Sequence, residues 1–231
     1  MPKAIITMTS TNTEDLQRLI RLLTWLSPGF PTGGFAFSHG LEWSIEAGDV
    51  LDETTLGDWI ADVLRNGAGR SDTILLRHAY TADPGGLPEL CVLGVALGFG
   101  RERRSETCAQ GAAFIRAGSV WGGPRIGVLF DKDVPYPIAV GALAADHRVG
   151  VDFAAAAYLQ AFAAGLVSAA VRLIPLGQTA GLRVRAMLEP LIIELVEHTR
   201  RDGLDDLGGA GFRSDIAALR HETQPTRLFR T

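Results

Sequence analysis

Residues 25–48 read WLSPGFPTGGFAFSHGLEWSIEAG, and an apolar helical segment flanks this stretch on each side. Proline fixes φ and removes a backbone donor, while glycine reaches backbone conformations that other residues avoid. The stretch is therefore predicted to be a shaped turn between two helices. Three phenylalanines can anchor it to a core: Phe30, Phe35 and Phe37. Three polar residues follow, which we expect to belong to the functional surface: Ser38, His39 and Glu42.

Apolar residues recur at helical spacing along most of the chain, whereas period-two strand patterns are nearly absent. One apolar stripe precedes the turn, from Leu16 to Leu26, and another runs from Val184 to Val196 across Pro190, which should bend its helix. Residues 153–171 are mostly alanine and are predicted to form a buried central helix rather than a membrane span. The sequence predicts an all-α, single-domain bundle of about eight to ten helices, with loop over residues 121–137.

Composition and charge narrow the class of protein. The 231 residues are 47% hydrophobic and 21% charged, which excludes wholesale disorder. The formal net charge of −4 argues against nucleic-acid binding by bulk charge. Cys91 and Cys108 are isolated, and the first residues carry no export signal, so we expect reduced thiols in a cytoplasmic protein.

The chain divides by composition into three parts. Residues 1–12 are predicted to be a flexible N-terminus, residues 13–202 the helical domain, and residues 203–231 a linker and tail. The linker is glycine-rich over residues 203–211. The tail ends in an apolar and basic run, Arg227-Leu228-Phe229-Arg230, which is unusual for a free terminus and must dock on this chain or on a partner.

No catalytic or metal-binding pattern stands out. Ser38 and His39 superficially resemble the nucleophile elbow of serine hydrolases, but that elbow needs a preceding strand, and none is predicted. The five histidines are scattered without metal-ligand spacing, although His39 with Glu42, or His221 with Glu222, could contact a transient ion. No P-loop is present, so nucleotide binding by this chain is not expected. These residues indicate a helical binding protein.

Three blocks of the sequence resemble the signature of the urease accessory protein F family. The first is Leu26-Ser27-Pro28 with Phe30 to Glu42, and the second is Arg172-Leu173-Ile174-Pro175-Leu176-Gly177-Gln178-Thr179, after which Ala180 replaces the family's acidic residue. The third runs from Asp215 to Thr223 and continues with residues 227–230. The blocks occur in the family's order and span nearly the whole chain.

The resemblance implies a non-enzymatic, cytoplasmic chaperone for nickel insertion into urease, which dimerises and acts without membrane or nucleic acid. It would bind a scaffold accessory protein of the D or H type, the accessory GTPase and apo-urease, and it would modulate the GTPase. Nickel and GTP would be handled by the complex, and no cofactor or metal by this chain. The residues expected to bind partners are Phe35, Ser38, His39, Glu42, Gln178, Arg220, His221, Glu222, Arg227, Leu228, Phe229 and Arg230. The alternatives are a stand-alone helical adaptor and a serine hydrolase using Ser38 and His39.

Overall fold

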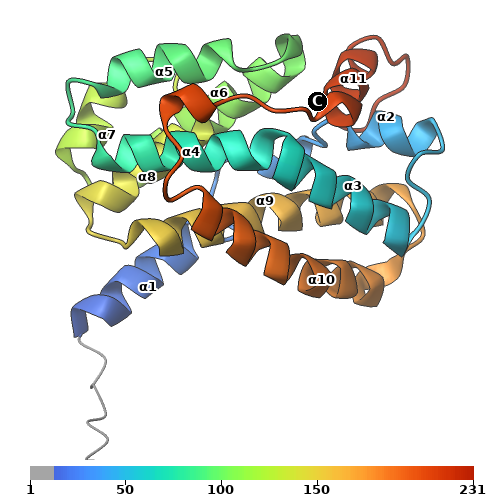
Figure 1. The fold of residues 1–231 in the computed structure, drawn as a ribbon, viewed down its shortest axis with the longest axis horizontal. Helices are drawn as coiled ribbons and strands as arrows, with labels where there is room; N and C mark the ends of the chain where they lie inside the picture. The colour runs from blue at the N-terminus through green and yellow to red at the C-terminus, as the bar shows by residue number, and fades with distance from the viewer. Residues whose placement is uncertain (1–12) are drawn as a thin grey trace, which may run out of the picture.

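The computed structural model describes residues 13–231, which contain eleven α-helices, two single-turn 3-10 helices and no strand. In chain order the elements are α1 (Thr13–Trp25), η1 (Gly34–Ala36), α2 (Leu41–Glu46), α3 (Glu53–Asn66), α4 (Ala68–Thr81), α5 (Leu87–Ala96), α6 (Gly100–Gly118), α7 (Pro124–Leu129), α8 (Tyr136–Asp146), α9 (Val151–Leu173), α10 (Gly177–His198), η2 (Leu204–Asp206) and α11 (Phe212–His221). The all-α prediction is confirmed (Figure 1). The prediction for residues 1–12 lies outside the described residues.

One additional helix, α7, lies within residues 121–137, which the sequence indicated to be loop. Pro124 stands in its first turn, where the missing backbone N–H costs nothing. Ile126 and Leu129 are buried against the core and stabilise this short helix. The predicted loop is therefore wrong over residues 124–129, because tertiary burial outweighs the local proline and glycine signals.

Helix α9 lies at the centre of the body, as the alanine-rich pattern predicted, and contacts α2, α3, α4, α8 and α10. It is long and apolar enough to span a membrane by composition alone, yet half of its apolar window is buried inside the protein. Helices α4 and α8 pack closely, and a Cβ at Gly141 would lie 2.2 Å from the Leu76 carbonyl oxygen. Small side chains thus set the close spacing of these helices.

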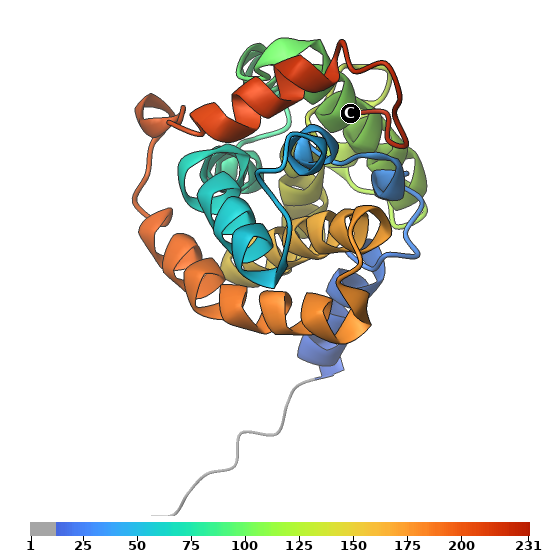
Figure 2. The same ribbon diagram turned by 90° about the vertical axis from the view of Figure 1, so that its right-hand side faces the viewer.

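Helices α10 and α11 lie on opposite sides of the body, and α1 projects from the α10 side (Figures 1 and 2). The buried side chains of Leu22 and Trp25 pack the end of α1 against the core. Four apolar residues of its predicted stripe instead face outward and are between 48% and 64% exposed: Leu16, Leu19, Ile20 and Leu23. The apolar stripe of α1 is therefore an exposed surface on the α10 side of the body.

The glycine-rich residues 203–211 lie against α4 in the structure. Arg70 donates to the Asp206 carbonyl oxygen at 2.7 Å and pairs with Asp202 at 2.9 Å. A Cβ at Gly209 would lie 2.2 Å from the Asn66 carbonyl oxygen. This segment leads directly to α11, which packs on α2 and α6. The division of the chain at residue 203 stays a prediction from composition.

Candidate interaction site

Three segments that are far apart in the sequence meet at one place. They are the glycine-rich turn between α1 and α2, the end of α9, and residues 222–231, here called the terminal segment. Arg172, at the end of α9, donates through Nη2 to the Phe35 carbonyl oxygen at 2.9 Å. Its guanidinium carbon lies 4.3 Å from the centre of the Phe229 ring, a cation–π contact. One arginine therefore bridges the turn and the terminal segment.

The turn approaches α11 without intervening side chains. Gly40 has a φ of +78°, and a Cβ at this position would lie 2.7 Å from the Ala218 amide nitrogen. Only glycine meets both requirements at low cost. His39 also has a positive φ, +60°, which is uncommon for a residue with a Cβ and stores local strain. The turn is thus shaped so that α2 and α11 lie in direct contact.

His221 is completely buried between two carboxylates. Its Nδ1 lies 2.7 Å from Glu102 Oε2, and its Nε2 lies 3.0 Å from Glu42 Oε2. With both carboxylates ionised, each ring nitrogen faces an acceptor, an arrangement that matches the two N–H donors of an imidazolium. We call Glu42, His221 and Glu102 the clasp.

The clasp holds the terminal segment. Glu42 accepts hydrogen bonds from the Leu228 amide at 2.6 Å and the Phe229 amide at 2.9 Å, and Arg227 donates to Glu102 at 2.8 Å. Burial raises the pKa of Glu42, but the hydrogen bonds from His221 and from the two amides outweigh it and hold that pKa below its ordinary value. The ionised form of Glu42 is therefore the one that binds the terminal segment.

A second buried group anchors Thr231. The Ser38 amide and the Ser38 hydroxyl both donate to the Thr231 main-chain oxygen, at 2.6 Å and 2.7 Å. The Thr231 hydroxyl lies 3.2 Å from Glu106, which also accepts from Arg103 at 2.7 Å. Burial raises the pKa of Glu106, but the Arg103 guanidinium opposes it, and the pKa falls to about 2. The Thr231 side chain is thus held beside the buried, ionised carboxylate of Glu106.

His39 belongs to the same group, with its Nδ1 3.6 Å from Glu106 Oε2, too far for a hydrogen bond. Burial lowers the pKa of His39, and the Arg103 charge lowers it further. His39 therefore tends to be neutral and packs edge-on against Phe162, with ring centres 5.0 Å apart. Its role in this structure is internal.

The predicted partner-binding residues divide into two sets. Five are buried and form the interior of the site: Ser38, His39, Glu42, His221 and Phe229. Six are exposed and available to a partner: Phe35, Gln178, Arg220, Arg227, Leu228 and Arg230. Glu222 is half-buried and accepts from the Arg101 amide at 2.7 Å. Direct contact with a partner is thereby open to the second set only.

Sequence reasoning missed Glu102, Arg103 and Glu106, which complete both buried groups. Glu102 and Glu106 are four residues apart and so share one face of α6. That spacing was the one available signal, and it is also typical of a solvated helix face. Local sequence does not distinguish the two cases, because His221 and Arg227, which contact Glu102, and Thr231, which contacts Glu106, all lie more than 100 residues away.

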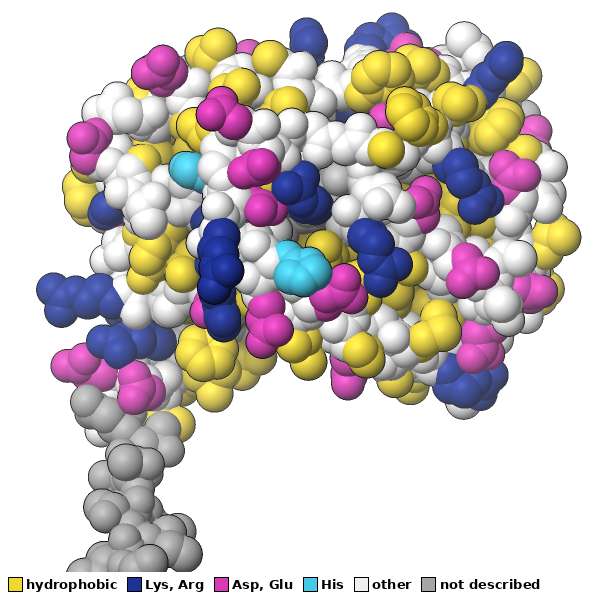
Figure 3. All heavy atoms as spheres, in the orientation of Figure 1, with side chains coloured by type: hydrophobic (Ala, Val, Ile, Leu, Met, Phe, Trp, Pro, Cys, Tyr) yellow, Lys and Arg dark blue, Asp and Glu magenta, His cyan; other side chains and the backbone are white. Residues whose placement is uncertain are grey.

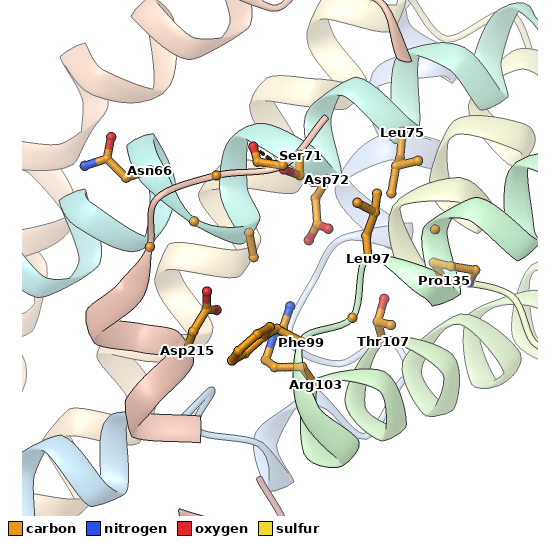
Figure 4. A pocket seen from close by; sticks show the side chains of 17 residues that line it. Asn66, Ser71, Asp72, Leu75, Leu97, Phe99, Arg103, Thr107, Pro135 and Asp215 are labelled. Carbon is orange, nitrogen blue, oxygen red and sulfur yellow. Dashed lines mark hydrogen bonds between the residues drawn. The ribbon is translucent and has the colours of Figure 1, made fainter. Parts of the chain in front are cut away.

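Two hollows meet inside the bundle. One, of about 200 Å³, opens beside α4 and α11 and is lined by Asp215 and Phe99; the other, of about 510 Å³, lies under the glycine-rich turn. Both are lined by Asp72, Arg103 and Thr107, and Figure 4 shows Asp72, Arg103 and Asp215 pointing into the same space. Burial raises the pKa of Asp72 to about 6. The wall between the hollows is therefore polar and titratable.

The arrangement offers little to catalysis. The Ser38 hydroxyl is buried and donates to a main-chain oxygen rather than to a base. A hydrolase nucleophile must be accessible and activated by a neighbouring base. Across residues 13–231, no group of three or more His, Cys, Asp or Glu side chains is placed to hold a metal ion. What the geometry does provide is a rigid mount for an exposed segment.

Comparison with known proteins gives a consistent family. Residues 50–189 match the UreF protein family. A urease accessory protein UreF from Rhodopseudomonas palustris (strain BisB5) is 45% identical over 226 residues, which cover 94% of this chain and 93% of the relative. UreF proteins from Methylobacterium sp. (strain 4-46) and Azorhizobium caulinodans are 47% and 46% identical, covering 91% and 97% of this chain and 87% and 100% of their own lengths.

Proposed function

This chain belongs to the UreF family of urease accessory proteins and takes part in urease maturation, and on this basis we propose that it is a non-catalytic bridging chaperone. It joins a scaffold accessory protein of the D or H type and the nickel-carrying GTPase to apo-urease in the cytoplasm. It modulates the GTPase so that nickel enters the urease active site. Nickel is cargo in this scheme, and GTP is bound by the partner.

One observation carries the scaffold contact: a buried clasp fixes an exposed, apolar and basic segment. Arg227, Leu228 and Arg230 are exposed, while Phe229 between them is buried. A free terminal segment would lose conformational entropy on binding, of about 1–2 kcal/mol for each ordered residue. A segment that is already held has lost that freedom before the partner arrives, which favours its use as a docking surface.

The GTPase contact is assigned to the glycine-rich turn and the nearby α9–α10 connection. Phe35 projects from the turn with 76% of its surface exposed, and Gln178 is exposed at the start of α10. A large exposed aromatic side chain on a rigid turn is a typical anchor for a protein partner. Ser38, His39 and Glu42 support this surface from beneath rather than touching the partner.

The two hollows that meet at Asp72 and Arg103 support a role in passing the ion between partners. A hydrated divalent cation is favoured by carboxylate and hydroxyl oxygens, which Asp72, Thr107 and Asp215 supply. No group of three or more His, Cys, Asp or Glu side chains among the described residues is placed to hold a metal ion, so the wall is too sparse in ligands for tight retention.

The homodimer is assigned to α1. Its outward stripe lies next to charges of both signs, since Arg18 pairs with Glu14 and Asp15. Mixed charge on an apolar helix suits pairing with a second copy in antiparallel register, which sets each sign against its opposite. A helix of 13 residues is also marginal alone in water, so burial of this stripe would stabilise it.

The test is co-purification of the chain with the accessory GTPase and the scaffold protein, with mass measured by light scattering. The measurement is repeated with and without GTP and nickel. A complex that holds paired copies of each protein is the expected result. No association under any condition would refute the bridging role and would leave a stand-alone helical adaptor as the better description.

A further inference from the structure

Helix α1 is attached to the body mainly through its last turn. Of its 13 residues, Leu22 and Trp25 alone are buried. The buried Trp25 Nε1 has no hydrogen-bond partner among the described residues, which weakens this attachment. Figure 3 shows hydrophobic side chains and charged ones of both signs together where α1 projects from the body. The position of α1 is therefore sensitive to any further contact that is made or lost.

One such contact is polar and joins α1 to His147 at the end of α8. Arg21 Nη1 lies 3.2 Å from His147 Nδ1, and His147 Nε2 lies 3.1 Å from the Gly122 carbonyl oxygen. A guanidinium only donates hydrogen bonds and a carbonyl oxygen only accepts them, so these two partners require the neutral ring with its proton on Nε2. His147 therefore connects α1 to α8 and to the loop between α6 and α7.

Protonation of His147 would reverse the contact with Arg21. A proton on Nδ1 would set an N–H group against the guanidinium and place two positive charges side by side. Burial lowers the pKa of His147 and the Arg21 charge lowers it further, while the Gly122 carbonyl and the Asp146 charge oppose this without offsetting it. The charged groups that act on the ring are thus Arg21 from α1 and Asp146 from its own helix.

The imidazole has little freedom to turn away from Arg21, because the end of α8 is fixed. The Asp146 side chain is only 1% exposed and accepts hydrogen bonds from two amides at the start of α7, at 3.0 Å and 3.2 Å. Beyond His147, the Val149 amide donates to the Ala144 carbonyl oxygen at 2.9 Å and closes the helix. Repulsion between the ring and the guanidinium is therefore relieved by movement of α1, the less firmly held of the two helices.

We propose that His147 is a pH-sensitive latch for α1, in which the neutral ring accepts from Arg21 and holds the helix on the body, and the protonated ring repels Arg21 and releases it. In the released state the ring is solvated and takes up a proton near its ordinary pKa of about 6.5. The docked state then binds fewer protons than the released state. Its stability therefore rises with pH, and it is lost as pH falls below about 6.5 until the ring is protonated in both states.

The latch has a consequence for the homodimer, and this consequence alone rests on the proposed function. The exposed apolar stripe of α1 is the surface assigned above to self-association. A released α1 no longer presents that stripe in a fixed position, so ordering it again would oppose association. The dimer should therefore be favoured at neutral pH and weakened in acid.

The first test follows the His147 ring by NMR as pH is changed. Arg21→Gln removes the facing charge and should raise the pKa of His147 toward its ordinary value. Arg18→Gln is the matched control, since Arg18 lies about one turn earlier on α1 and pairs with Glu14 and Asp15 instead; it should leave that pKa unchanged. Equal pKa values of His147 in the wild type and in Arg21→Gln would overturn the latch.

The second test measures hydrogen exchange at α1 amides relative to α9 amides, because Asp72 titrates in the same range and changes the stability of the whole body. From about pH 7.5 to about pH 5.5, the relative protection of α1 should fall, by as much as about tenfold for each pH unit below about 6.5. His147→Gln is neutral at every pH and should abolish this dependence. His198→Gln, at an exposed histidine of α10, should preserve it.

The outcomes separate the latch from the homodimer. The same pH dependence in the wild type and in His147→Gln would overturn the latch, and so would protonation of His147 without any change in the protection of α1. Light scattering on the same samples tests the dimer, which should dissociate in acid for the wild type and persist for His147→Gln. A chain that is monomeric at every pH would refute the homodimer, while hydrogen exchange would still decide for or against the latch.

Discussion

Substitution of Glu42 by alanine should release the terminal segment while leaving the helical body folded. Glu42 accepts three hydrogen bonds, from the His221 ring at 3.0 Å and from the amides of Leu228 and Phe229 at 2.6 Å and 2.9 Å. Alanine leaves these donors without an acceptor and leaves His221 with one carboxylate. Each buried unpaired donor costs about 1–3 kcal/mol, and breaking one side of a buried charged pair costs about 3–5 kcal/mol.

The contacts that remain are comparable in size. Burial of Phe229 contributes about 2–3 kcal/mol, and the hydrogen bonds that anchor Arg230 and Thr231 add about 1 kcal/mol each. A loss of about 3 kcal/mol therefore removes most of the free energy that holds the segment, and far less than the whole domain's stability. Local opening should become the dominant motion of residues 222–231.

Hydrogen exchange at the amides of residues 228–230 measures this directly. Their protection should fall roughly a hundredfold in Glu42→Ala, and trypsin should cleave after Arg227, while amides of α9 keep their protection. Asp49→Ala is the matched control, because Asp49 is an exposed acid three residues beyond α2. Unchanged protection at Phe229, together with loss of partner binding, would refute the clasp and make Glu42 a contact residue.

Gly40→Ala should destabilise the chain by several kcal/mol in urea denaturation, because the added methyl group collides with α11 and alanine is strained at this positive φ. Gly48 also has a positive φ but has open space around it, so Gly48→Ala should cost only about 1 kcal/mol. Equal losses of stability in the two variants would contradict the close contact between Gly40 and α11. Asp72 has a raised pKa of about 6, so the native state binds more protons than the unfolded state and stability falls as pH rises from about 4 to about 6. Asp72→Asn should remove that decline and stabilise the protein at neutral pH by on the order of 2 kcal/mol, and an unchanged pH profile of the urea midpoint would refute it. Leu23→Asp on α1 should shift the proposed homodimer to monomer in light scattering without lowering helical content, and a persistent dimer would exclude α1 as its interface.

Helical periodicity was sufficient to predict the class of fold. The stripe of α3, with Leu56, Ile60 and Leu64, is fully buried, and the alanine-rich α9 is central. The same reasoning does not give the outward direction of the α1 stripe, because a stripe that faces a core and one that faces a partner have the same period. Nor does it give α7, whose six residues depend on the burial of Ile126 and Leu129.

The sequence points to some of the residues that the structure brings together here, but not to Glu102, Arg103 or Glu106, and not to how any of them are arranged. Ser38, His39, Glu42 and His221 are part of one centre, but 179 residues separate Glu42 from His221, and no local rule pairs them. Because these side chains are buried, they contact other parts of this chain rather than solvent. A histidine beside a glutamate in sequence, such as His221 and Glu222, suggests a local pair, whereas the ring binds Glu42 and Glu102 instead.

A single substitution can weaken partner binding in two ways, by releasing the terminal segment or by removing a direct contact. Because the clasp is buried, its residues can act only in the first way. On the proposed function, a variant of His221 should weaken partner binding because Leu228 and Arg227 are no longer held, whereas a variant of Arg220 should weaken it because a contact is lost. In the first case the effect depends on the terminal segment being docked, and in the second it does not. In a double-mutant cycle, Glu42→Ala should therefore reduce the effect of an Arg227 substitution, since that side chain is already displaced, and should leave the effect of Arg220→Glu on α11 largely additive. Coupling of this kind identifies the clasp as the element that positions the binding surface.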